Sequence, residues 1–274
     1  MSRAKKLLVR TATGGTLLAV LSGLLWWTQR ANSGWPVFGV GAVLTFLAAL
    51  ELGRMGKLGQ RLTSFALLAA VPLVAGVVAH QMNEGHAAAW VTVGGGLLAS
   101  SLPALLVPAK QRRLQLLCQL WVVPPLILLV TIQARHGVLG LTALLLLSKV
   151  GDIAGYYFGQ AFGKHHPFPK LSPGKTTEGC TASFIAALVL GAVLHLGFDW
   201  GAGGQWGLLG ALAAAGLTNL ASQGGDLLES AAKRSAGVKD SSGWVGASGG
   251  VLDVVDSLLL SVPAALLAWP LLAP

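Results

Sequence analysis

The sequence contains few charged residues and few cysteines. Only 11% of its 274 residues are charged, whereas a soluble domain usually carries about 25%, so most of the surface must face something other than water. The two cysteines, Cys118 and Cys180, lie in separate apolar stretches, which argues against a disulfide framework and against a thiolate zinc site. Acidic residues are scarcer than basic ones, 10 against 19. The placement of the basic residues explains this excess better than nucleic-acid binding does.

Long apolar runs are what the chain has instead. Hydrophobic residues make up 54% of it, and its mean hydropathy is +0.68. Apolar runs of roughly 18 residues or more can cross a bilayer as helices. We therefore expect an all-α fold, a polytopic transmembrane helical bundle of about nine spans, with the first run retained as a signal-anchor helix. The predicted spans cover residues 11–28, 35–52, 62–79, 87–107, 114–133, 137–162, 180–196, 206–222 and 251–272.

Lysine and arginine residues are concentrated in alternate connecting segments. They occur in the N-terminal tail and near residues 54–61, 110–113, 164–175 and 233–239. Cytoplasmic loops are enriched in these residue types. The sequence therefore predicts a cytoplasmic N-terminus and four cytoplasmic loops, in a multi-pass protein of the inner or plasma membrane.

Acidic residues divide the chain into two parts. The first five predicted spans contain almost no ionisable side chains, and their Gly, Ala and Ser residues suit close helix packing in lipid. We interpret residues 1–136 as a transmembrane scaffold and residues 137–274 as a transmembrane catalytic region with cytoplasmic loops. Seven of the ten acidic residues lie on or near the cytoplasmic side of the second part: Asp152, Glu178, Asp226, Glu229, Asp240, Asp253 and Asp256.

Asp253 and Asp256 begin the last predicted span, three residues apart and therefore on one helical face. Two carboxylates held this close repel each other unless a cation lies between them or one of them is protonated. Mg²⁺ is typically held by one or two carboxylates together with substrate phosphates. A helix-start effect is the alternative, because acidic residues are favoured near a helix N-terminus. Two acids on one face favour the metal site.

The segment 225–234 predicts a helix with acidic and basic side chains on one face. The residues of that face are Asp226, Glu229, Ser230 and Lys233. They form either a solvated face with ion pairs or a site in which Asp226 joins the metal ligands and the cations hold phosphate. Lys149 and Asp152, also three residues apart, predict an intrahelical ion pair or a direct role in the site.

Two loops rich in Gly, Ser and Thr, 171–179 and 239–250, carry lysine and precede a predicted helix. The first contains Gly174-Lys175-Thr176, but it is not a P-loop, because Pro169 stands where that motif requires Gly. Such a loop can still bind an anion through backbone N–H groups. With the nearby acids, the two loops predict a phosphate-rich ligand and a metal.

Residues 149–260 resemble the phosphatidate cytidylyltransferases, or CDP-diacylglycerol synthases, in four blocks that keep the family's order. The blocks are Asp152-Ile-Ala-Gly-Tyr-Tyr-Phe-Gly159, Pro169-Lys170-Leu-Ser172-Pro173-Gly-Lys175-Thr176-Thr-Glu178-Gly179, Gly225-Asp226-Leu-Leu-Glu229-Ser230, and a C-terminal set of Ser230, Lys233-Arg234, Lys239-Asp240-Ser241-Ser242, Gly249-Gly250, Asp253 and Asp256. Two positions depart from the family pattern, with Ser248 in place of His and Val254 in place of Arg. They leave a catalytically inactive relative as one alternative.

The resemblance implies transfer of CMP from CTP to phosphatidate or a similar lipid phosphate, giving CDP-diacylglycerol and pyrophosphate. The implied catalytic residues are Asp226, Lys233, Asp253 and Asp256. The implied substrate-binding residues are Ser172, Lys175, Thr176, Glu178, Ser230, Arg234, Lys239 and Asp240. Mg²⁺, alone or with a second cation, is expected on Asp226, Asp253 and Asp256. The expected partners are CTP, the lipid phosphate and the bilayer, with a homodimer as an option and no nucleic acid.

Two other functions are kept as alternatives. One is a related CTP-using membrane enzyme, either a polyprenol or dolichol kinase or a synthase acting on an archaeal-type ether lipid. A kinase would release CDP, whereas a cytidylyltransferase releases pyrophosphate. The other is a transporter or channel, which predicts acidic residues along a path through the bilayer, whereas here they cluster on one side.

Overall fold

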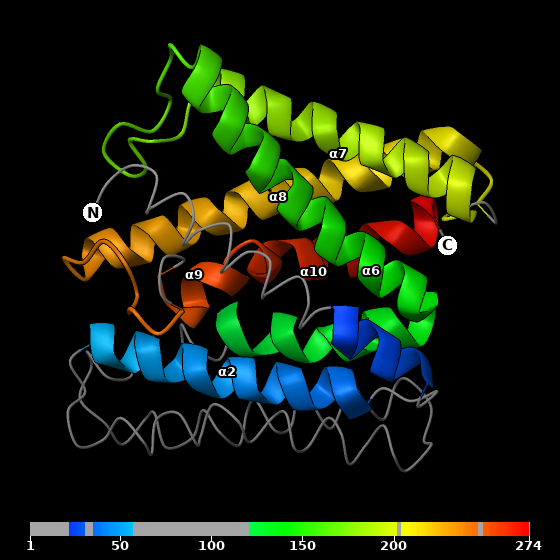
Figure 1. The fold of residues 1–274 in the computed structure, drawn as a ribbon, viewed down its shortest axis with the longest axis horizontal. Helices are drawn as coiled ribbons and strands as arrows, with labels where there is room; N and C mark the ends of the chain where they lie inside the picture. The colour runs from blue at the N-terminus through cyan, green and yellow to red at the C-terminus, as the bar shows by residue number, and fades with distance from the viewer. Residues whose placement is uncertain (1–21, 31–34, 57–120, 202–203, 246–248, 274) are drawn as a thin grey trace. The chain divides into compact units, whose positions relative to one another are not determined.

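The computed structural model describes residues 22–30, 35–56, 121–201, 204–245 and 249–273, and every regular element within these ranges is a helix (Figure 1). This confirms the predicted all-α class. Residues 22–30 are helical. The elements that follow are α2 (Trp35–Met55), α6 (Val123–Phe162), α7 (Thr177–Phe198), α8 (Gly207–Ser235), α9 (Val251–Val255) and α10 (Leu258–Leu272).

Within the described ranges, four helical stretches are long and apolar enough to cross a membrane, as expected for a membrane protein. They are Pro36–Met55, Val123–Phe162, Thr177–Phe198 and Val251–Leu272. The third of them covers the predicted span 180–196, and α6 contains a break at Gly137 (φ 65°), where the predicted span 137–162 begins. The runs 62–79 and 87–107, and most of 11–28, lie outside the described residues. The nine-span count and the cytoplasmic N-terminus therefore stay predictions.

Helix α8 joins two separate predictions, the span 206–222 and the helix 225–234, into one element. It is not among the four apolar stretches, because its buried side carries polar residues such as Thr218, Asn219 and Ser222. Gly225 lies in the interior of α8. The packing there leaves no room for a larger residue, because a Cβ would collide with the backbone carbonyl oxygen of Asp256.

The chain divides into two compact units. Unit 1 comprises Met1–Val130 and Ala236–Val255, and unit 2 comprises Thr131–Ser235 and Asp256–Pro274. In unit 1, α2 packs against α9. In unit 2, α8 packs against both α7 and α10. The compact units thus differ from the predicted division at residue 136, whose scaffold and catalytic roles stay predictions.

The core of unit 2 is built on α8 and the last helix. Trp269 of α10 is fully buried and donates its indole N–H to Thr218 Oγ1 of α8 at 3.0 Å. It also packs edge-on against Trp200, with ring centroids 5.1 Å apart. A buried indole needs a hydrogen-bond partner, and Thr218 supplies one. These contacts fix α8 against α10.

Candidate functional site

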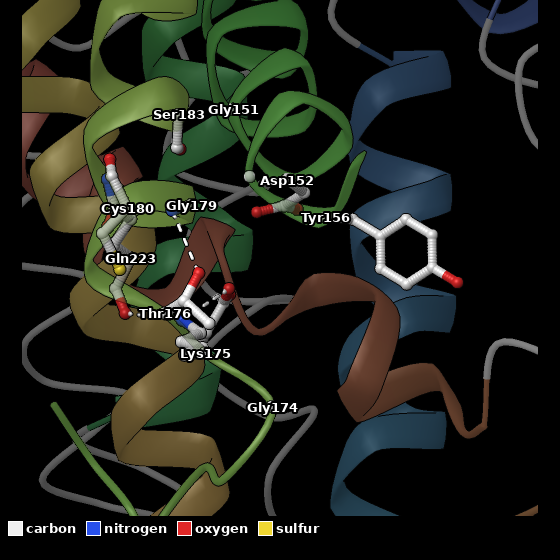
Figure 2. A pocket seen from close by; sticks show the side chains of 12 residues that line it. Gly151, Asp152, Tyr156, Gly174, Lys175, Thr176, Gly179, Cys180, Ser183 and Gln223 are labelled. Carbon is white, nitrogen blue, oxygen red and sulfur yellow. Dashed lines mark hydrogen bonds and ion pairs between the residues drawn. The ribbon is translucent and has the colours of Figure 1, made fainter. Parts of the chain in front are cut away.

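Unit 2 contains a pocket of about 200 Å³ between α6, α7, α8 and the loop that precedes α7. Its charged lining residues are Asp152 of α6, Lys175 of the loop and Asp226 of α8. Figure 2 shows Asp152 and Lys175 beside the same space, with Thr176 at the start of α7. Residues from three of the four blocks quoted above therefore meet at one pocket.

Glycines let the walls of this pocket approach closely. A Cβ on Gly179 of α7 would lie 2.7 Å from the carbonyl oxygen of Gly155 on α6. A Cβ on Gly159 would lie 3.0 Å from Thr176 Oγ1. Such distances are too short for side-chain atoms, so α6 and α7 contact each other through their backbones here. This close approach brings Asp152 to the same pocket as Lys175.

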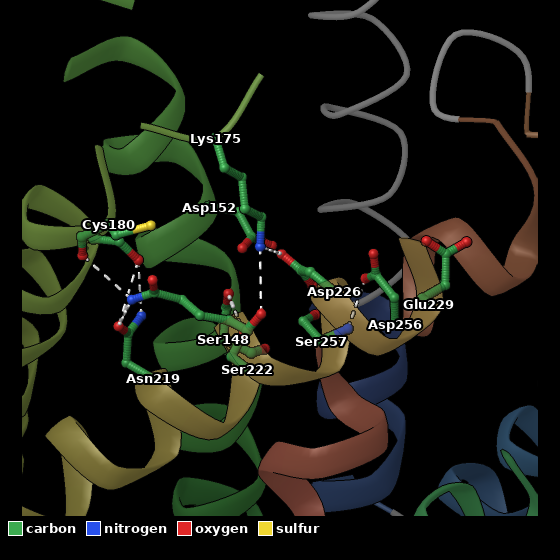
Figure 3. A network of polar contacts seen from close by, with 12 residues as sticks. Ser148, Asp152, Lys175, Cys180, Asn219, Ser222, Asp226, Glu229, Asp256 and Ser257 are labelled. Carbon is green, nitrogen blue, oxygen red and sulfur yellow. Dashed lines mark hydrogen bonds and ion pairs between the residues drawn. The ribbon is translucent and has the colours of Figure 1, made fainter. Parts of the chain in front are cut away.

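Lys175 and Asp226 form an ion pair across the pocket, with 3.1 Å between Lys175 Nζ and Asp226 Oδ2. The same Nζ donates to the backbone carbonyl of Gln223 at 3.3 Å. Both side chains are mostly buried, at 23% and 17% exposure. The structure therefore brings together two residues that the sequence assigned to different roles, substrate binding and catalysis (Figure 3).

Asp152 also belongs to this charged cluster, although the sequence analysis did not include it among the site residues. Lys149 Nζ lies 3.4 Å from Asp152 Oδ2 and donates to Ser257 Oγ at 2.8 Å. The predicted ion pair is therefore present, and Asp152 lines the pocket as well. The i, i+3 spacing predicted either an intrahelical ion pair or a direct role in the site, and the two are compatible.

Asp226 and Asp256 are brought near each other by close packing of α8 on the turn between α9 and α10. Gly225 contacts the backbone of Asp256, and Figure 3 shows Asp256 beside Asp226. Asp256 Oδ1 accepts the N–H of Ser257 at 2.6 Å. Asp226 Oδ1 is buried and has no hydrogen-bond partner among the described residues. A buried carboxylate oxygen of this kind is suited to a cation, because hard divalent cations take oxygen ligands.

Asp253 lies in unit 1, where its carboxylate accepts hydrogen bonds near the start of α9. Its Oδ2 accepts hydrogen bonds from Gly250 N at 2.6 Å, from Ser241 N at 3.1 Å and from Ser241 Oγ at 2.7 Å. A carboxylate at the third helical position that reaches back to the capping N–H is the geometry of a capping box. This is the helix-start role that the sequence left as an alternative.

The predicted cluster of three aspartates is therefore divided between the units. Asp226 and Asp256 belong to unit 2 and Asp253 to unit 1. Helix α9 ends at Val255, so Asp253 and Asp256 do not lie on one continuous helix as predicted. In the part of the chain that the structure describes, no group of three or more His, Cys, Asp or Glu side chains is arranged to hold a metal ion. The joint site stays a prediction.

The other predicted substrate-binding residues have varied surroundings. Thr176 Oγ1 caps α7 by accepting the N–H of Gly179. Glu178 accepts the N–H groups of Lys164 and His165 at 3.1 and 3.3 Å, which ties the preceding loop to α7. Ser172 and Ser230 are half-buried, whereas Arg234, Lys239 and Asp240 are exposed.

Lys233 forms an ion pair with Glu229, with 2.6 Å between Nζ and Oε2. Glu229 is only 1% exposed, so of the two alternatives for this face, the solvated one does not hold at Glu229. The i, i+4 ion pair that this alternative included is present.

Glu51 is a second residue that the sequence analysis did not include. It lies in α2, within the predicted scaffold, and its buried carboxylate accepts hydrogen bonds from Ser241, Ser242 and the backbone N–H groups of Val251 and Leu252. A signal was available, because Glu51 is the only acidic residue within the first five predicted spans. An ionisable group in a membrane span is costly and usually has a task.

Comparisons with known proteins agree with the resemblance in sequence. The Cytidylyltransferase family model matches residues 8–271. A phosphatidate cytidylyltransferase of Helicobacter pylori is 31% identical over 245 residues, which cover 89% of this chain and 85% of that protein. One of Haemophilus influenzae is 40% identical over 129 residues, 47% of this chain and 44% of that protein. "Uncharacterized protein YnbB" of Escherichia coli is 37% identical over 142 residues, 50% of this chain and 45% of that protein.

The matches to the Haemophilus and Escherichia proteins span less than half of each relative's length. The family match, by contrast, extends over nearly the whole sequence, including the pocket of unit 2 and the α9 segment of unit 1. The chain belongs to the cytidylyltransferase family.

Proposed function

We propose that this protein is a membrane nucleotidyltransferase that moves CMP from CTP to phosphatidate and releases pyrophosphate. The observation that carries the proposal is the buried Lys175–Asp226 pair in the pocket, with Asp226 Oδ1 left without a partner among the described residues. Family membership and the names of the Helicobacter and Haemophilus relatives support the same reaction.

The reaction requires positioning and charge stabilisation more than a reactive side chain. An oxygen of the lipid phosphate attacks the α-phosphorus of CTP and forms the new P–O bond. The bond from the α-phosphorus to the bridging oxygen breaks, and its electron pair leaves with pyrophosphate. Both reactants are polyanions, so cationic side chains that contact them lower the repulsion between them. Lys175 is the proposed group for this task, with Lys233 and Arg234 from α8 and Lys239 from unit 1.

The proposed carboxylate ligands for Mg²⁺ are Asp226 and Asp256 in unit 2 and Asp253 in unit 1. The unpartnered Asp226 oxygen fits such an ion. When bound, Mg²⁺ supplies positive charge that neutralises nucleotide phosphates. Lys175 holds Asp226 from the pocket side, and Gly225 keeps α8 close to the backbone of Asp256. A second cation at the site is part of the proposal.

A membrane location suits the lipid substrate. We propose about nine spans, a cytoplasmic N-terminus and a site that faces the cytoplasm at headgroup depth in the inner or plasma membrane. The basic loops support this orientation. The diacyl chains then stay in the bilayer while the nucleotide approaches from the cytoplasm.

The test is an assay of the purified full-length protein in detergent micelles with labelled CTP, phosphatidate and Mg²⁺. The proposal predicts a CDP-lipid and pyrophosphate in equal amounts. Release of CDP with a phosphorylated lipid would identify a kinase instead. Binding of CTP without any product would identify an inactive relative. Asp226→Asn is the control variant. We expect it to bind phosphatidate in the micelles like the wild type but to form no product.

A further inference from the structure

Glu51 connects α2 to a segment about two hundred residues later in the chain, all within unit 1. Its side chain is 0% exposed. Oε1 accepts the N–H of Val251 at 2.8 Å and the hydroxyl of Ser242. Oε2 accepts the N–H of Leu252 and the hydroxyl of Ser241, each at 2.8 Å. Each carboxylate oxygen therefore has one backbone donor and one hydroxyl donor.

The backbone donors are the first N–H groups of α9, which have no partner within their own helix. Figure 1 shows α9 beside α2, in agreement with their packing contacts. A buried carboxylate is costly unless hydrogen bonds satisfy it, and four donors meet that requirement here. Glu51 thus caps a helix of the C-terminal half from a helix of the N-terminal half.

The same carboxylate holds both ends of the segment 241–252. Ser241 and Ser242 are at one end of it, and Val251 and Leu252 at the other. Gly250 fits between them only because it lacks a side chain, since a Cβ there would collide with Ser241 Oγ and with the Glu51 carboxylate. One helical turn beyond Glu51, the guanidinium of Arg54 lies 4.2 Å from the ring centroid of Trp244 in this segment. Two side chains of α2 therefore hold the segment.

Ser241 links Glu51 to Asp253. Its hydroxyl oxygen lies 2.8 Å from Glu51 Oε2 and 2.7 Å from Asp253 Oδ2. One hydroxyl hydrogen serves one of these two carboxylates at a time. The position of Asp253 is thus set by a segment that Glu51 holds at both ends.

We propose that Glu51 is a positioning residue for the transfer reaction: it fixes residues 241–242 and 251–252, so that the neighbouring Lys239 and Asp253 are presented to the nucleotide phosphates and their cation. This inference rests on the proposed function. Glu51 itself, whose carboxylate is buried and hydrogen-bonded to other residues of unit 1, does not touch substrate. Helix α2 then contributes directly to the geometry of the site, in contrast to the scaffold role predicted from the sequence for this part of the chain.

The main variant is Glu51→Gln. An amide has a single oxygen acceptor, so its NH₂ group must face the N–H of either Val251 or Leu252, donor against donor. The serine hydroxyl on that side can rotate and accept, but a backbone N–H cannot. We expect a roughly 10- to 100-fold fall in kcat/KM for CTP, with half-saturating CTP and Mg²⁺ concentrations both raised, since losing a hydrogen bond to a charged group has about this effect. Half-saturation by phosphatidate should not change.

A purely structural role would act differently. It would lower the amount of active protein, and hence the maximal rate, without changing the concentration of CTP that gives half of that rate. That result for Glu51→Gln would overturn the proposal. Thr45→Val is the matched control, because Thr45 is also buried in α2 and its hydroxyl donates to the carbonyl of Gly41 within the same helix, at 2.8 Å. We expect its CTP and Mg²⁺ dependence to equal that of the wild type.

Ser241→Ala is a milder variant that keeps the experiment decisive if Glu51→Gln fails to fold. It removes the hydroxyl shared by Glu51 and Asp253, and we expect the same shift in CTP and Mg²⁺ half-saturation, smaller in size. The double variant should fall short of the product of the two single effects, because the residues act through one contact. An unshifted Ser241→Ala, or strictly multiplicative effects, would contradict the proposal.

A second measurement does not depend on activity. Amide hydrogen exchange of the peptides covering residues 249–253 should be faster in Glu51→Gln than in the wild type, and unchanged in Thr45→Val. Unchanged exchange in Glu51→Gln would show that the Glu51 hydrogen bonds do not stabilise the start of α9. A different result would be a wild-type protein without activity, combined with faster exchange in Glu51→Gln. It would show that Glu51 holds α9 in place but would overturn the proposed function, and with it the proposed role of Glu51 in the reaction.

Discussion

Lys175 Nζ lies 3.1 Å from Asp226 Oδ2 although the two residues are 51 positions apart in the chain. The loop before α7 supplies the lysine and the interior of α8 supplies the aspartate. An ion pair with limited exposure is held in a surrounding of lower dielectric than a surface pair, so each partner depends more strongly on the other. The pair is therefore the most direct place to test the pocket.

Replacing Lys175 should remove activity. In Lys175→Ala, the Asp226 carboxylate loses its cationic partner and the pocket loses the charge proposed to neutralise phosphate. We expect CDP-lipid formation to fall by roughly 100-fold or more. The measurement is the initial rate at saturating CTP and phosphatidate. Lys164→Ala is the control, because that side chain is exposed in the preceding loop, and a similar loss in the control would show that the effect is one of general charge.

The close approach of α6 and α7 can be tested with a pair of glycines on α7. In Gly179→Ala, the new Cβ would lie 2.7 Å from the carbonyl oxygen of Gly155. We expect the helices to separate, activity to be lost and the free energy of unfolding to fall by about 1–3 kcal/mol, as for other overpacked sites. Activity and thermal unfolding in detergent would be measured together.

The matched variant is Gly197→Ala, near the end of the same helix, where a Cβ would meet nothing within 4 Å. Alanine has the higher helix propensity, so this variant should keep its activity and be at least as stable as the wild type. Equal behaviour of the two variants would contradict the close-packing explanation.

The sequence was informative where the relevant contacts are local. Apolar runs predicted the helices, and i, i+3 or i, i+4 spacing offered, each as one of two alternatives, the Lys149–Asp152 and Glu229–Lys233 ion pairs, which the structure contains. For Asp253 and Asp256, spacing alone does not reveal that α9 ends at Val255, between the two residues.

Glu51 illustrates what local patterns cannot supply. Its four donors are 190 to 201 residues away in the chain, and no periodicity relates positions so far apart. Its isolation within an apolar span was a usable signal, but only the fold identifies the partner. The Lys175–Asp226 pair was likewise beyond spacing arguments, although both residues were chosen as site candidates for their chemistry.

Cys180 offers a way to probe the pocket in solution, since it is among the pocket-lining residues and is half-buried. In a Cys118→Ser background, alkylation of Cys180 by a small maleimide should inhibit CDP-lipid formation, because the adduct fills space beside Lys175 and Asp226. CTP with Mg²⁺ should slow both the labelling and the inhibition. Labelling that proceeds at the same rate with and without nucleotide would place CTP elsewhere. Cys180→Ala, active and insensitive to the reagent, is the control for the site of modification.

Asp253→Asn separates the two roles that Asp253 can have. Asp253 Oδ2 accepts three hydrogen bonds, and the carbonyl oxygen of asparagine can take that position and still cap α9. The negative charge is lost. If capping is the whole role, activity and unfolding temperature should both stay near the wild type. If Asp253 also binds the cation, as we propose, thermal unfolding should change little while activity falls by roughly 100-fold or more, and raising the Mg²⁺ concentration should restore part of it. The measurement is a Mg²⁺ titration of the initial rate alongside a melting curve, and retained activity at low Mg²⁺ would remove Asp253 from the proposed metal ligands.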